Sequence, residues 1–147
     1  AVVLGSANHT MRNDGSSEDE ARRMGQHLTD EFGDDYYSLG LLFGTGTFTA
    51  PTNPDRTAFS THRLGTPASG TLEATLADVS GAPLFLDFEA ASDGGRVDEW
   101  LSTGRVRVSV PRAAKRGGVP LPASASGLYD GVAFVPTVGA ASFGDGT

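Results

Sequence analysis

Short apolar runs along the chain predict the strands of a sheet. The run over 36–43 is almost continuously apolar, which is typical of a strand covered on both faces in a parallel sheet. Residues 105–110 alternate with a period of two, which predicts a strand with one face in water. Further strands are predicted at 1–4, 56–64, 83–88 and 131–136, with 56–64 as a short edge strand.

Helical spacing predicts three helices between these strands. The longest runs over 17–32, where Ser17 and Glu20 have the spacing of a capping box and Gly33 is a natural C-terminal stop. Shorter helices are predicted at 72–79 and around 97–101. The apolar stripe of the longest helix consists of Ala21, Met24, Leu28 and Phe32.

The alternation of strands and helices predicts the fold class. It is α/β, with three layers (α/β/α) and a mainly parallel sheet. The chain of 147 residues is about one domain, and an apolar strand at its very start leads us to expect neighbouring strands from an absent segment. A surface excursion is expected over 111–127 and a flexible tail over 140–147.

Composition excludes several functional classes. The 18 acidic residues outnumber the 11 lysines and arginines, and the resulting net charge of −7 argues against a nucleic-acid partner. Without cysteine, the chain has no disulfide, thiolate metal site or cysteine nucleophile. No membrane span or signal peptide is visible, so we expect a cytoplasmic protein. The bias toward arginine and aspartate fits a GC-rich genome or a salt-loving host equally well.

Two strand ends followed by small polar residues are candidate sites, because ligands of α/β sheets bind outside the carboxyl ends of strands. The first is the loop that contains Asn8 and His9, where histidine is a natural general base and asparagine can polarise a carbonyl group. A solvated loop histidine is the alternative. The second is Gly44-Thr45-Gly46-Thr47-Phe48, for which a simple glycine-rich turn is the alternative.

Asp87 and Glu89 form a third candidate at the end of the strand predicted over 83–88. Two residues apart, they are expected to point to the same side and to hold a base or a cationic group. Capping of the following turn is the alternative role. No histidine has metal-ligand spacing, and neither a phosphate-binding P-loop nor a nucleophile elbow is present. We therefore expect no metal and no cofactor.

Several short motifs follow one another in a fixed order. They are Asn8-His9 after an apolar strand, Met24-Gly25-Gln26-His27-Leu28, Phe32-Gly33-Asp34-Asp35-Tyr36-Tyr37, Phe43-Gly44-Thr45-Gly46-Thr47-Phe48-Thr49-Ala50 and Tyr129-Asp130-Gly131. In this order they resemble the C-terminal part of the erythromycin esterase family. That family has a histidine-asparagine-x-histidine loop, an M-G-x-x-L helix, an F-G-D-x-Y turn and an F-G-x-G-x-F-x-A loop.

The resemblance implies that residues 1–139 are the C-terminal part of an erythromycin-esterase-like domain. It implies hydrolysis of a macrolactone or related ester by water, with histidine as base and no obligatory metal. His9 would be the base or its assistant, with Asn8 beside it. Substrate contacts are expected from Gly44, Thr45, Gly46, Phe48 and Asp87.

The chain departs from the family pattern at the site itself. Ala7 stands where the first histidine of the family loop would be, and His9 matches the second only if one residue is missing between them. The family also takes glutamate and histidine residues from an N-terminal segment, against which this chain is expected to pack. Two functions therefore stay open: an ester hydrolase, and a non-catalytic relative that binds a small molecule without turnover.

Overall fold

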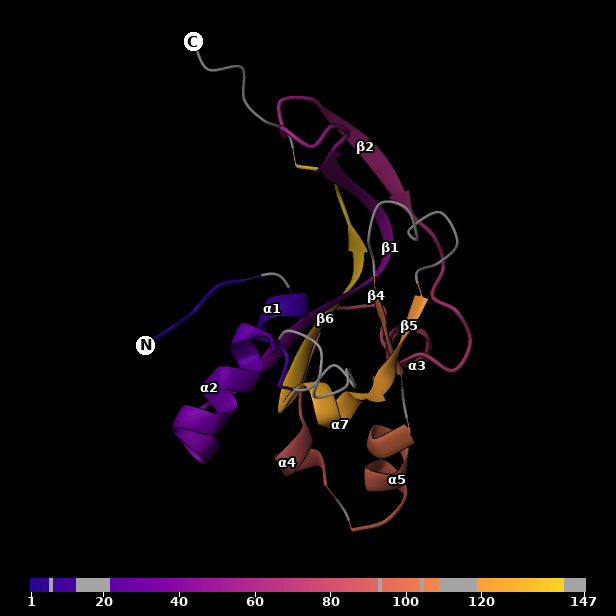
Figure 1. The fold of residues 1–147 in the computed structure, drawn as a ribbon. Helices are drawn as coiled ribbons and strands as arrows, with labels where there is room; N and C mark the ends of the chain where they lie inside the picture. Colours follow the sequence, from indigo (N-terminus) through magenta and orange to yellow (C-terminus); the bar gives the residue numbers. More distant parts are fainter. Residues whose placement is uncertain (6, 13–21, 93, 104, 109–118, 142–147) are drawn as a thin grey trace.

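A four-stranded sheet is the centre of the computed structural model, which describes residues 1–5, 7–12, 22–92, 94–103, 105–108 and 119–141 (Figure 1). A separate two-stranded sheet pairs β4 with β5. The central strands are β1 (Leu39–Pro51), β2 (Phe59–Leu64), β3 (Leu84–Asp87) and β6 (Gly131–Val138), in the order β2-β1-β6-β3. The small sheet consists of β4 (Arg105–Val108) and β5 (Val119–Ser124).

Short helices connect these strands and confirm the α/β class. The helix predicted over 72–79 is present with those bounds, and the Thr71 hydroxyl caps it by accepting from the Ala74 N–H. Gly33 ends α2 (Met24–Phe32), as predicted, and it has a positive φ of 51°. The described helices are α1 (Ala7–Thr10), α2 (Met24–Phe32), the 3-10 turn η1 (Gly33–Asp35), α3 (Leu72–Val79), α4 (Phe88–Ala91), α5 (Arg96–Thr103) and α7 (Ala125–Leu128).

The directions of the strands are mixed, whereas we expected a mainly parallel sheet. β1 and β6 run parallel, but β1–β2 and β3–β6 are antiparallel. The reason for the first antiparallel pair is a short connection, since a tight turn can join only antiparallel neighbours. Asn53 closes this turn, its side-chain oxygen accepting from the N–H groups of Thr57 and Ala58 at 3.1 Å each.

β1 continues through the glycines that we expected to form a loop. β6 pairs with β1 as far as Gly46, and β2 pairs with it from Gly46 onward, so the strand has a partner along its length. A side chain at Gly44 would overlap the carbonyl oxygen of Pro136, and one at Gly46 that of Val138. The two glycines therefore allow close strand pairing, and the predicted loop is wrong.

The hydrophobic core lies on one face of the central sheet. Val132 and Phe134 of β6 are fully buried there, and Leu42 of β1 lies beside them. They pack against side chains of α3, α4, α5 and α7, which lie between the strands in sequence. The other members of this cluster are Met11, Leu72, Leu76, Phe88, Leu101, Ala125, Leu128 and Tyr129.

The opposite face of the sheet exposes large apolar side chains. Leu39 and Leu41 of β1 and Phe85 of β3 project from it, and each is about half exposed. No helix in the described ranges buries them, so the second helical layer of the expected three-layer arrangement is not seen there. We call Leu39, Leu41, Phe85 and Ala133 the outer sheet face.

The N-terminal apolar run was predicted as a buried strand, and this prediction is wrong. Val2 and Leu4 are 89% and 92% exposed, and the run has no strand conformation. Figure 1 shows it extending away from the sheet. None of the described strands pairs with it.

The predicted surface excursion over 111–127 contains β5 and α7, which the sequence reading missed. β5 includes two prolines, which an edge strand tolerates because its outward N–H groups need no partner. The Ser124 hydroxyl then caps α7 by accepting from the Gly127 N–H at 3.2 Å. Residues 109–118, like the predicted helix start with Ser17 and Glu20, lie outside the described ranges.

The packing of α2 on α1 depends on a glycine more than on the predicted apolar stripe. Met24 and Phe32 are 38% and 54% exposed, whereas Gly25 is buried. A Cβ atom at Gly25 would overlap the backbone oxygen atoms of Met11 and Thr10. Close backbone contact therefore sets the distance between these helices.

We expect Gly25→Ala to lower the free energy of unfolding by about 1–3 kcal/mol, because backbone atoms must move to admit the methyl group. Urea unfolding followed by circular dichroism measures this change. Gly81→Ala is the matched control, since nothing lies within 4 Å of a Cβ there. Equal losses in both variants would contradict the close packing of α2 on α1.

Candidate functional site

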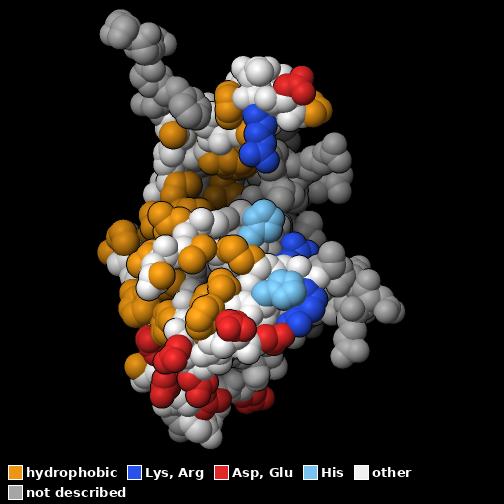
Figure 2. Space-filling model, turned by 60° about the vertical axis from the view of Figure 1, so that its left-hand side comes forward, with side chains coloured by type: hydrophobic (Ala, Val, Ile, Leu, Met, Phe, Trp, Pro, Cys, Tyr) orange, Lys and Arg blue, Asp and Glu red, His pale blue; other side chains and the backbone are white. Residues whose placement is uncertain are grey.

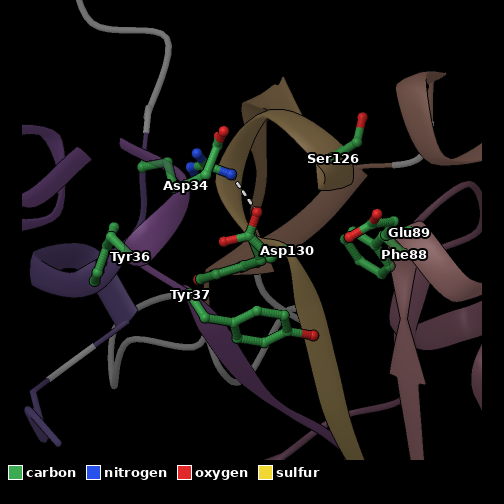
Figure 3. A pocket seen from close by; sticks show the side chains of 9 residues that line it. Asp34, Tyr36, Tyr37, Phe88, Glu89, Ser126 and Asp130 are labelled. Carbon is green, nitrogen blue, oxygen red and sulfur yellow. Dashed lines mark hydrogen bonds and ion pairs between the residues drawn. The ribbon is translucent and has the colours of Figure 1, made fainter. Parts of the chain in front are cut away.

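A pocket of about 520 Å³ opens where β1 and β6 begin and β3 ends (Figure 3). Its walls combine aromatic rings with charged groups. The segments just before β1 and β6 meet here because those strands are parallel, and β3 adds its carboxyl end because it is antiparallel to β6. The pocket is lined by Arg12, Asp34, Tyr36, Tyr37, Phe88, Glu89, Ser126, Tyr129 and Asp130.

Asp130 connects the elements around the pocket. One carboxylate oxygen forms an ion pair with the Arg12 guanidinium, marked by the dashed line in Figure 3. The other oxygen accepts from the Ser38 N–H at 2.7 Å. Its backbone N–H donates to Ser38, and its carbonyl accepts from the Phe88 N–H, both at 2.9 Å. One residue thus holds the chain after α1, the start of β1 and the start of α4.

The short helix α1 is held at its C-terminal end by these same elements. The Thr10 carbonyl accepts from the hydroxyls of Tyr36 and Ser38. The Arg12 N–H donates to the Leu128 carbonyl at 2.8 Å. A four-residue helix is not stable alone, so these contacts determine where α1 lies. His9 is exposed on this anchored turn, three residues before the pocket-lining Arg12.

Asp87 has the capping role that we considered as an alternative, and it also bonds to the pocket wall. Its Oδ1 accepts from the Ala90 N–H at 2.9 Å, which caps α4. Its Oδ2 accepts from the Tyr37 hydroxyl at 2.7 Å. These two hydrogen bonds, the first being the stronger cause, hold the pKa of Asp87 below its usual value. Glu89, its predicted neighbour on a strand, lies in α4 and lines the pocket.

Tyr37 is held in its neutral form. Desolvation and then the hydrogen bond to Asp87 raise the pKa of Tyr37 to about 12, and the charges of Asp87, Asp130 and Glu89 add to this. At neutral pH the wall therefore presents a phenol hydroxyl beside an ionised carboxylate.

The predicted wall at Gly44, Thr45, Gly46 and Phe48 lies elsewhere. These residues lie on β1, six to ten positions after Ser38, which is next to the pocket. At the rise of a strand, they are on the order of 20–30 Å from Ser38. The Phe48 ring stacks on His62 across β1 and β2, with ring centroids 5.4 Å apart. The structure brings Asp87 to the pocket rim, but it does not bring residues 44–48 there.

Sequence reasoning missed Arg12, Tyr37 and Asp130 as site residues. Tyr36-Tyr37 begin the strand predicted over 36–43, and Asp130 stands directly before the strand predicted over 131–136, which was an available signal. If two strands are parallel, the residues before them meet at one edge of the sheet. The rule for α/β sheets points to carboxyl ends of strands, and Arg12 has no local pattern that marks it.

No three histidine, aspartate or glutamate side chains in the described part of the chain come together as a metal site. Likewise, none of its helices is long and apolar enough to cross a membrane.

We expect Asp130→Ala to lower the free energy of unfolding by about 1.5–3 kcal/mol, because it removes two hydrogen bonds made by a charged group. Chemical unfolding of the purified chain measures this. Asp30→Ala breaks the exposed Arg22–Asp30 ion pair and is the matched control, with an expected loss below about 1 kcal/mol. A similar loss in the two variants would show that Asp130 does not connect these elements.

Stability should fall as the pH rises from about 10 to about 12. A raised pKa in the folded state means that the unfolded chain loses the Tyr37 proton first, so this contribution is present below pH 10 and lost above it. Asp87→Asn should lower the pKa of Tyr37, and Tyr37→Phe should make the decline shallower. Urea unfolding at several alkaline pH values measures it. If the stability of Tyr37→Phe declines as steeply as that of the wild type, the raised pKa of Tyr37 does not cause the decline.

The family model described as erythromycin esterase matches residues 2–138. The comparison with curated protein sequences finds no match. Among solved structures, a succinoglycan biosynthesis protein is similar with a TM-score of 0.70 and 16% identity, over 90% of this chain and 32% of that one.

Two further solved structures are similar. A Bacillus cereus protein has a TM-score of 0.68 and 18% identity, over 90% of this chain and 32% of that one. A histidine-to-asparagine mutant of the erythromycin esterase EreC, in its open conformation, has a TM-score of 0.56 and 20% identity, over 89% of this chain and 30% of that one. The chain thus spans about a third of the length of these structures. Since the family model matches nearly its whole length, the chain belongs to the erythromycin esterase family.

Proposed function

We propose that this chain forms part of an ester hydrolase site in which His9 is the general base. The observation that supports this best is the anchoring of α1, which presents an exposed histidine from a turn held by Tyr36, Ser38 and Leu128. A base must be held in place to act on a bound substrate. Membership of the erythromycin esterase family makes an ester the expected substrate class.

In the proposed reaction, His9 takes a proton from water while the water oxygen attacks the acyl carbon of the ester. The bond from that carbon to the alkoxy oxygen then breaks, and the leaving oxygen takes the proton from His9. An acid and an alcohol result, or a single opened chain if the substrate is a macrolactone. Asn8 would polarise the carbonyl group.

The pocket would bind the rest of the substrate. Tyr36, Tyr37 and Phe88 offer apolar ring surface, and the Tyr37 hydroxyl is kept protonated next to Asp87. Asp87 would act here as a positioning residue through Tyr37. The wall proposed at Gly44, Thr45, Gly46 and Phe48 would contact only an extended substrate, because it lies further along β1.

We also propose that an N-terminal segment of the family domain completes the site. The chain spans about a third of the similar structures, and the resemblance assigns glutamate and histidine residues to that segment. Ala7 at the position of an expected histidine makes such a contribution more important.

Binding without turnover is the second candidate function. Ala7 favours it, because the resemblance expects two histidines in this loop and the chain has His9 alone there. The pocket of about 520 Å³ would then be a binding site for a small molecule without water activation.

We expect His9→Ala to slow hydrolysis by about 10²–10⁴-fold, the usual contribution of a general base. The test incubates the chain with erythromycin, or with a simple activated ester, and follows the addition of water by mass spectrometry. His27→Ala, which changes an exposed histidine of α2, is the matched control and should keep wild-type activity.

Equal turnover by wild type and His9→Ala would refute the assignment of the base. Saturable binding of erythromycin by the wild type, without any turnover, would favour the second candidate.

A further inference from the structure

The outer sheet face is a continuous apolar row across three strands. The registers place Leu41 opposite Ala133, and Ala133 opposite Phe85, so the three side chains lie side by side on one face. Leu39 extends this row toward the start of β1. Leu39, Leu41 and Phe85 are 48%, 55% and 59% exposed. Figure 2 shows a broad apolar area on the side of the molecule that it presents.

This exposure is unusual for these strands. The β1–β6 pair is parallel, and parallel strands are normally covered on both faces. Their other face is covered completely, with Val132 and Phe134 at 0% exposure. A contiguous exposed apolar patch of this kind marks an interaction site.

One end of the outer sheet face is acidic. Asp87 of β3 pairs with Gly131 of β6, which in turn pairs with Leu39 of β1. Asp87 is two residues after Phe85 on β3, so it lies on the same face of the sheet, in line with Leu39. Glu89 is close enough to raise the pKa of Tyr37, the residue bonded to Asp87. Acidic side chains gather at the lower end of the apolar area in Figure 2. A second copy of this chain, with its own net charge of −7, would be repelled here.

The similar solved structures have enough additional chain to cover this face. This chain matches 30–32% of their lengths, so about two thirds of each has no counterpart here. An amphipathic helix is the element that covers a sheet face in α/β proteins. A basic residue at one end of that helix would complement Asp87 and Glu89.

We propose that the outer sheet face is the docking site of an amphipathic helix with a basic end, supplied by the part of the family domain that this chain does not contain. The helix packs its apolar stripe on Leu39, Leu41 and Phe85, and its lysine or arginine lies next to Asp87. The proposal rests on the incomplete domain in the proposed function, but it does not depend on ester hydrolysis.

The test titrates the purified chain with a synthetic helical peptide of about 18 residues, with leucines on one face and two arginines at one end of it. Calorimetry gives the affinity, and amide chemical shifts locate the site. We expect saturable binding that shifts the amides of Leu39, Leu41 and Phe85. Phe85→Thr should weaken it about tenfold or more, as expected for a central aromatic anchor.

Matched controls isolate the face and the charge. Phe32→Thr changes a phenylalanine that is 54% exposed on α2, and it should leave the affinity unchanged. A peptide of scrambled order should not bind, and one with glutamates in place of the arginines should bind more weakly.

The proposal is overturned if the peptide does not bind, if the scrambled peptide binds equally, or if Phe85→Thr has no effect. If the glutamate peptide binds as tightly as the arginine peptide, the helix does not need a basic end. Self-association that Phe85→Thr abolishes, without peptide binding, identifies a second copy as the occupant. Because no outcome involves turnover, failure here is distinguishable from failure of the hydrolase proposal.

Discussion

The arrangement of the site depends on the carboxylate of Asp130. It accepts from a guanidinium and a backbone N–H at the same time, while its own backbone bonds to the residues before β1 and after β3. Hydrogen bonds to a charged acceptor are roughly twice as strong as neutral ones. The side chain of Asp130 therefore holds Arg12 and Ser38, and its backbone adds Ser38 and Phe88. Asp130 thus ties Arg12, just after α1, to the segments that line the pocket, and the bonds of Thr10 to Tyr36 and Ser38 complete the anchoring of α1.

The pocket lies at the amino ends of the parallel strands, not at their carboxyl ends. This is possible because the sheet is mixed. β3 runs against β6, so it delivers Asp87, Phe88 and Glu89 to the edge where Tyr37 and Asp130 begin their strands. The rule that ligands bind at carboxyl ends still describes β3 here. The hydroxyl of Tyr37 and the carboxylate of Asp87 are neighbours for the same reason.

Among the described residues, helices cover one face of the central sheet. The buried face supplies the core, while the outer sheet face and the N-terminal run expose large apolar side chains to water. The similar solved structures are about three times as long as the matched region. The exposed outer sheet face and Ala7, at the position of the first histidine of the family loop, are the two features on which the proposal of a contributing N-terminal segment rests.

The sequence by itself determined several local elements, such as α3 and the end of α2, and the family. Thr71 caps α3 and Gly33 ends α2, because capping depends on residues only a few positions apart. Tertiary structure alone decided the strand directions, the passage of β1 through Gly44 and Gly46, and the pocket. Each of these depends on hydrogen bonds between residues far apart in the chain, such as the 92 positions between Ser38 and Asp130, for which local periodicity has no signal.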